Sequence, residues 1–149
     1  MASPSGQRLL RYDRRLGVRF VAGADEAGRG SLAGPLVVAG VLFDYESLHG
    51  HRTRPLALLN DSKQVDPEAR EKLLRAVIHA AAHIAVRVIP ACDIDRNGLH
   101  RSNLDGLRDV RAQSRIVARL ARAREDSFGV TRSLGAGLSE MKIDVGPGY

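Results

Sequence analysis

Residues 18–43, VRFVAGADEAGRGSLAGPLVVAGVLF, contain two apolar runs separated by a glycine-rich segment. The first run, Val18 to Ala24, predicts a strand that ends at the acidic pair Asp25 and Glu26. The second run, Pro35 to Phe43, is continuous and rich in β-branched residues, which is typical of a buried strand. The stretch therefore predicts two strands joined by a turn, with two carboxylates at the end of the first.

Predicted helices and strands follow one another in the rest of the chain. Asp66 offers an N-cap and Pro67 a first helical position, and together they predict a helix that runs to about His83. The residue pattern predicts three further segments: a strand over 84–89, a connector over 91–98 and a helix from His100 to about Arg122.

The chain has 149 residues, which is room for one ordinary domain with its own core. Residues 1–15 are polar and basic, so we expect a flexible basic arm there and a single domain over 16–149. Lys and Arg number 23 against 17 Asp and Glu, a net charge of +6 that favours polyanionic partners such as nucleic acid. A surface rich in solvated arginine gives the same balance, so charge alone leaves the partner open.

Cysteine content and hydropathy indicate the compartment. A single cysteine, Cys92, allows no internal disulfide, and no apolar run approaches the roughly 20 residues that span a bilayer. Residues 1–15 lack the apolar stretch of a signal peptide. The sequence therefore predicts a cytoplasmic protein without membrane association, and we expect a monomer.

The acidic pair and the glycine-rich turn after it are the candidate chemical site. Neighbouring carboxylates on a strand point to opposite faces, so Asp25 and Glu26 share one metal site only if the strand ends or bends there. Gly28 and Gly30 let a ligand approach the backbone and present N–H groups to a phosphate, while Arg29 adds positive charge. The alternative is an ordinary hairpin turn with solvated acids.

The string from Gly23 to Pro35, Gly-x-Asp-Glu-Ala-Gly-Arg-Gly-x-Leu-Ala-Gly-Pro, is followed by an apolar strand and resembles the signature of the ribonuclease HII family. The element Asp-Ser-Lys at 61–63 resembles a second motif of that family, and residues 93–103 resemble its connector and the start of its next helix. Together these segments extend the resemblance over residues 17–110.

The resemblance implies an α/β fold, with a ribonuclease H-like mixed β-sheet flanked by helices, here without the family's C-terminal helical segment. It implies an endonuclease that hydrolyses the RNA strand of RNA–DNA hybrids, and ribonucleotides embedded in duplex DNA, to leave 5′-phosphate and 3′-hydroxyl ends. It also implies four carboxylates that hold two divalent ions, for which carboxylate ligands favour Mg²⁺ or Mn²⁺.

The family's functional residues map onto this chain as follows. Asp25 and Glu26 match the first two carboxylates. The third normally ends an apolar strand, and Asp126 is its nearest counterpart; Asp144 matches the fourth. Glycines of the family are replaced at both of these places. The substrate contacts fall on Gly28, Arg29, Gly30, Lys63 and Asn103.

Two other functions remain open. A hybrid-binding protein that kept the basic surface but lost its metal site would bind without cleaving. A P-loop-like nucleotide-binding protein would share the glycine spacing, but it needs a Lys-Ser/Thr pair and a helix where Pro35 begins a strand. His79 and His83 have the spacing of a metal pair on a helix but lack the glutamate of a zinc-protease motif.

Overall fold

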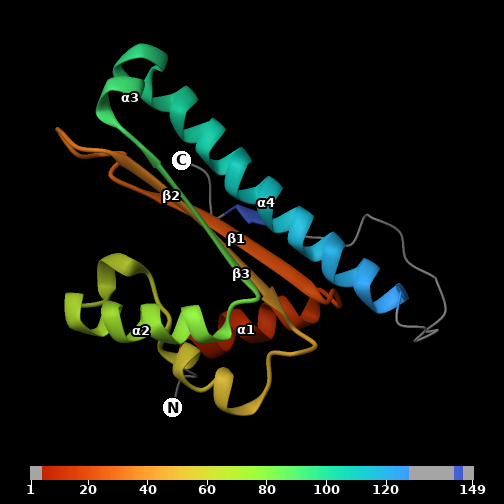
Figure 1. Cartoon of the computed structure of the whole chain (residues 1–149). Helices are drawn as coiled ribbons and strands as arrows, with labels where there is room; N and C mark the ends of the chain where they lie inside the picture. The colour runs from red at the N-terminus through yellow and green to blue at the C-terminus, as the bar shows by residue number, and fades with distance from the viewer. Residues whose placement is uncertain (1–4, 128–142, 146–149) are drawn as a thin grey trace.

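The computed structural model describes residues 5–127 and 143–145, and its centre is a four-stranded sheet in the order β3-β2-β1-β4 (Figure 1). The strands are β1 (Phe20–Ala27), β2 (Leu36–Asp44), β3 (His83–Ile89) and β4 (Ile143–Val145). β2 pairs antiparallel with both β1 and β3, whereas β4 pairs parallel with β1. The helices are α1 (Ser5–Arg15), α2 (Pro67–Ala80), α3 (Ala91–Asn97) and α4 (Leu99–Ser127). The predicted α/β architecture, a mixed sheet flanked by helices, is confirmed.

One face of the sheet is covered by α4, which runs along the strands in Figure 1. Leu36 and Val38 of β2 are fully buried there and pack with Val110 of α4. The helix comes very close to the sheet at Gly106, where an added Cβ atom would lie 2.8 Å from Cγ2 of Val38. A glycine at this point therefore sets the separation of α4 from the strands that carry the candidate site.

We expect Gly106→Leu to destabilise the protein, because a side chain at this position must push α4 away from β2. Overpacking of this kind costs about 1–3 kcal/mol. Ala112→Leu is the matched control, since Ala112 lies on the exposed side of the same helix. Denaturant unfolding should show the loss for the first variant alone; equal stability of the two variants would contradict the close packing.

The opposite face of the sheet is covered only at one end. There α1, α2 and the short 3₁₀ helices η1 (Gly50–Arg52) and η2 (Pro55–Leu58) meet, and Leu10 of α1 packs with Leu56 of η2 and with Phe43 of β2. Farther along the same face, Val86 and Val88 of β3 are each 59% exposed. In the described part of the chain, this face is therefore open beyond the α1–α2 layer.

Two sequence predictions are wrong. Residues 5–15 form a helix with a buried side chain at Leu10 and not a flexible arm, because α1 packs on η2; residues 1–4 lie outside the described part. Residues 91–97, expected to be a connector, form α3. In the described ranges no helix is both long and apolar enough to cross a membrane.

An ion pair between Arg19 and Asp44 links β1 and β2 at the ends that lie away from the glycine-rich turn. Arg19 donates from Nε and Nη2 to the two carboxylate oxygens of Asp44, at 3.0 and 2.8 Å. Burial acts to raise the pKa of Asp44, but the hydrogen bonds from Arg19 and from nearby backbone N–H groups outweigh it, so the pKa is lowered from its ordinary value of 3.8.

The lowered pKa gives Asp44 a stabilising effect that is present above pH 3.8 and is lost as the pH falls through the folded-state value. We expect Asp44→Asn to be less stable than the wild-type protein at pH 7, and the difference to shrink as the pH falls below 3.8. Thermal unfolding of both proteins from pH 7 to below pH 3.8 measures the difference in stability. A difference that does not change with pH would contradict a stabilising role of the ionised Asp44 carboxylate.

Candidate functional site

The acidic pair lies within β1 and not at its end. Pairing of β1 with β2 continues to Ala27, so Asp25 stands opposite Ala39 and Glu26 opposite Val38. Val38 is buried under α4, and paired residues of antiparallel strands share a face. Glu26 therefore faces α4 while Asp25 faces the open side, and the prediction of a strand end that unites the two carboxylates is wrong.

Glu26 is held by two neighbours. Its Oε1 accepts a hydrogen bond from Nδ2 of Asn103 on α4 at 3.1 Å, and Nη1 of Arg29 lies 3.3 Å from the same oxygen. The Glu26 side chain is only 14% exposed, and Asn103 is buried. Glu26 thus links the glycine-rich turn to α4, and Asn103, predicted to contact substrate, donates a hydrogen bond to this carboxylate.

Asp25 is exposed on the open face of the sheet. Its Oδ1 accepts a hydrogen bond from the backbone N–H of Glu26 at 2.9 Å. Gly23, two residues earlier on the same face, leaves open space, because an added Cβ atom would meet nothing within 4 Å. Asp25 is therefore the member of the pair that a ligand on this face can reach.

The turn after β1 combines a structural glycine with an accessible one. Gly28 has a φ of +92°, and an added Cβ atom would lie 2.5 Å from the backbone oxygen of Pro35, so the fold itself requires glycine there. Ser31 closes the turn by donating to the Gly28 oxygen from its N–H and its hydroxyl. At Gly30 an added Cβ atom would meet nothing within 4 Å, and Arg29 is 39% exposed. The turn thus leaves room for a ligand at Gly30, beside the Arg29 guanidinium.

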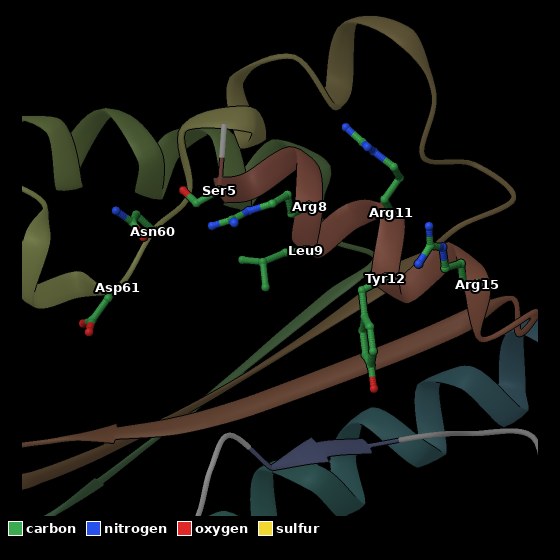
Figure 2. Close-up of a pocket in the computed structure, with 8 residues that line it drawn as sticks. All are labelled: Ser5, Arg8, Leu9, Arg11, Tyr12, Arg15, Asn60 and Asp61. Carbon is green, nitrogen blue, oxygen red and sulfur yellow. The ribbon is translucent and has the colours of Figure 1, made fainter. Parts of the chain in front are cut away.

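Lys63 lies away from this turn along the chain, in the short 3₁₀ helix η3 (Ser62–Gln64). Its backbone N–H donates to Oδ1 of Asp61 at 3.0 Å, and its side chain is exposed. Asn60 and Asp61 line a cavity of about 620 Å³ against α1, drawn in Figure 2. Residues 60 and 61, which precede Lys63, therefore lie beside α1. The cavity between this segment and α1 was not predicted from the sequence.

Asp126 lies in the last turn of α4, so the prediction that it ends a strand is wrong; its side chain lies outside the described part. α4 starts beside Glu26, at Asn103, and reaches Phe20 at the other end of β1 through Ala118. Asp126 is 23 residues beyond Asn103, about 35 Å along a helix. The structure does not bring it to the acidic pair.

Asp144 lies in β4. The parallel register places residue 144 beside Gly23, so the backbone of this candidate is on the strand next to Asp25. Its side chain lies outside the described part of the chain. Of the two C-terminal candidates, the backbone arrangement brings only this one to the strand that carries the acidic pair.

Among the side chains that the structure describes, which do not include those of residues 125–127 and 143–145, no group of three or more His, Cys, Asp or Glu is arranged to hold a metal ion. His79 lies in α2 whereas His83 begins β3, so the two histidines are not neighbours on one helix. Of the four carboxylates that the family resemblance implies, the structure describes the side chains of Asp25 and Glu26, and these lie on opposite faces of β1. These two side chains alone do not make up a two-ion set.

Comparison with known proteins gives one family. A family model for ribonuclease HII matches residues 22–131. A ribonuclease HII of Acidothermus cellulolyticus is 42% identical over 139 residues, which are 91% of this chain and 43% of that protein. One of Frankia alni is 43% identical over 139 residues, 91% of this chain and 55% of that protein. The chain spans about half the length of the curated relatives that it matches.

Solved structures give shorter or weaker matches. The ribonuclease H2 from Pyrococcus horikoshii OT3 is 33% identical, with a TM-score of 0.42, over 53% of this chain and 36% of that one. Bst-RNase HIII in complex with Mn²⁺ is 23% identical, with a TM-score of 0.45, over 89% of this chain and 38% of that one.

The bridge between α4 and the turn predicts an energetic coupling. Asn103→Ala removes a buried amide that donates to a carboxylate, and we expect it to lower the free energy of unfolding by about 1.5–3 kcal/mol. Asn97→Ala, at an exposed asparagine, is the matched control. In a double-mutant cycle with Glu26→Gln, a coupling of about 0.5 kcal/mol or more is expected. Additive effects would mean that Asn103 does not position Glu26.

Proposed function

The chain belongs to the ribonuclease HII family, and we propose that it acts in the hydrolysis of the RNA strand of RNA–DNA hybrids, with the described residues holding the hybrid. One observation carries this proposal. The turn at Gly28–Gly30 is exposed at the end of β1, next to Asp25, and Glu26 ties its arginine to Asn103 of α4.

The turn suits a phosphate for physical reasons. Gly30 allows the substrate backbone to approach the peptide N–H groups closely, and the exposed Arg29 guanidinium supplies a charged donor beside them. Contact with Glu26 restricts Arg29 before substrate arrives, so less conformational freedom is lost on binding. A phosphate held here places the adjacent 2′-hydroxyl against the same turn, and that hydroxyl distinguishes RNA from DNA.

Cleavage by two Mg²⁺ or Mn²⁺ ions is the finer part of the proposal. Such a centre needs several carboxylates around one point, and the described residues supply only Asp25 on the open face. Asp144, on the neighbouring strand, is the second ligand we propose. Glu26 is already engaged by Arg29 and Asn103, so we expect this chain to provide part of a ligand set.

The same observation favours a second candidate function, which is binding of hybrids, or of duplex DNA with embedded ribonucleotides, without cleavage. The Gly28–Gly30 turn with Arg29 and the net positive charge of the chain suffice for binding. Asp25 and Glu26, which lie on opposite faces of β1, do not suffice for a two-ion centre. The P-loop alternative fails on the fold, because the turn leads into β2 at Leu36 and not into a helix.

Hybrid binding is tested in EDTA, by fluorescence anisotropy with a labelled RNA–DNA hybrid and the DNA duplex of the same sequence. We expect the wild-type protein to prefer the hybrid. Arg29→Ala should weaken hybrid binding by about tenfold, which is the loss of one charge-assisted contact of about 1.5 kcal/mol. Arg75→Ala, at an exposed arginine of α2, should have little effect. Absence of any preference for the hybrid would overturn the proposal.

Hydrolysis is tested with the same hybrid in Mg²⁺ or Mn²⁺. If the chain cleaves, Asp25→Asn should abolish the product while hybrid affinity in EDTA is unchanged, because the substitution removes a charge and keeps the volume of the side chain. Undiminished turnover of this variant would remove Asp25 from the site. A wild-type protein that binds hybrids tightly but yields no product with either metal would select the second candidate function.

A further inference from the structure

We propose that the outer face of α1 is a second nucleic-acid contact, in which Arg8 and Arg15 bind the phosphate backbone beside Tyr12. The proposal rests on the proposed function, because the ligand is the same hybrid. It goes beyond that function, because α1 lies before the Gly28–Gly30 turn in the chain and outside the residues that the family model matches.

The inner side of α1 holds the helix in place. Leu10 is 8% exposed and packs with Leu48 and Leu56. One turn later, the hydroxyl of Tyr45 donates to Oδ2 of Asp13 at 2.6 Å. Leu10 and Asp13 therefore mark the inner side of α1, and the outer face is the opposite side of the helix.

The outer side combines cations with exposed apolar surface. Arg8, Leu9, Tyr12 and Arg15 line the 620 Å³ cavity, together with Ser5, Arg11, Asn60 and Asp61. Leu9 and Tyr12 are 55% and 58% exposed, so apolar surface lies beside the guanidinium groups. Figure 2 shows Tyr12 pointing from α1 toward the strands and Arg8 extending toward Asn60.

The charges of this cavity are not balanced within it. Among the residues that the structure describes, neither Arg8 nor Arg15 forms an ion pair. Asp61 is the only carboxylate among the lining residues, and its Oδ1 already accepts the N–H of Lys63. A hollow with unpaired guanidinium groups favours an anion.

The spacing fits a chain of phosphates and not a single one. Arg8 and Arg15 are seven residues apart, which is about 10 Å along a helix, whereas phosphates of one strand recur every 3.4 Å of duplex axis, or about three phosphates over the same length. The exposed Tyr12 ring between the two arginines offers a surface on which a sugar or a base can stack.

α1 and Asp25 lie on the same side of the sheet. Phe43 packs against the α1 cluster and pairs with Val21 of β1, and Val21 and Asp25 share a face because they are four residues apart on one strand. This separation is about 13 Å along β1. A duplex lying across the open face can therefore contact Asp25 and α1 together, whereas α4 is behind the sheet.

The test is the salt dependence of hybrid binding in EDTA, with Arg8→Ala/Arg15→Ala compared to Arg115→Ala/Arg119→Ala. The control removes the same two charges from the exposed side of α4, on the opposite face of the sheet. Each phosphate contact contributes about 0.9 to the slope of log affinity against log salt, so the α1 variant should flatten the slope by about two units and the control should not. Circular dichroism verifies that both variants fold.

A further measurement separates backbone contact from recognition of RNA. The α1 variant should lose affinity for the hybrid and for plain duplex DNA by the same factor, because phosphates are common to both. If the wild-type protein binds the hybrid and the α1 variant shows the same slope of log affinity against log salt as the control variant, the α1 site is overturned. The proposed function is then unaffected. A wild-type protein that fails to bind the hybrid would overturn both.

Discussion

The pairing of β1 with β2 through Ala27 is the constraint on which the arrangement of the site depends. A paired strand directs successive side chains to opposite faces, so it assigns Glu26 to the side of α4 and Asp25 to the open side. The half-buried carboxylate of Glu26 has its partners within the fold, in Asn103 and Arg29. The exposed carboxylate is left for a ligand. The alternation of side chains along one strand thus places Glu26 in contact with the fold and leaves Asp25 accessible.

Features determined by local physical chemistry could be predicted from the sequence. The start of α2 is one of them, since Asp66 accepts the N–H of Ala69 at 2.8 Å and Pro67 occupies the first turn. The strands over 36–44 and 83–89 are another, because short runs of β-branched residues between turn signals are typical of strands. The exposed glycine turn was also predictable, because the glycines of the motif mark a close approach to the backbone.

Features determined by tertiary contacts could not be predicted. α1 is rich in arginine and has little apolar sequence of its own, and it is held by packing of Leu10 and by a hydrogen bond to Asp13 from a residue 32 positions away. Nothing near Asn103 in the sequence indicates that its amide meets Glu26, 77 residues earlier. Asp126 was assigned to a strand end by resemblance alone, whereas the stretch before it continues α4. In each case the partner is distant in the chain, so local patterns carry no information about it.

The proposed position of a nucleic-acid duplex is the open face of the sheet, between the Gly28–Gly30 turn and α1, with α4 behind. Backbone amide NMR during titration of a labelled protein with an RNA–DNA hybrid in EDTA tests this placement most directly. The resonances of residues 28–31 and of the outer side of α1 should shift together, with a single dissociation constant, while those of the exposed side of α4 stay in place. Shifts confined to α4, or shifts of the turn without those of α1, would contradict this placement.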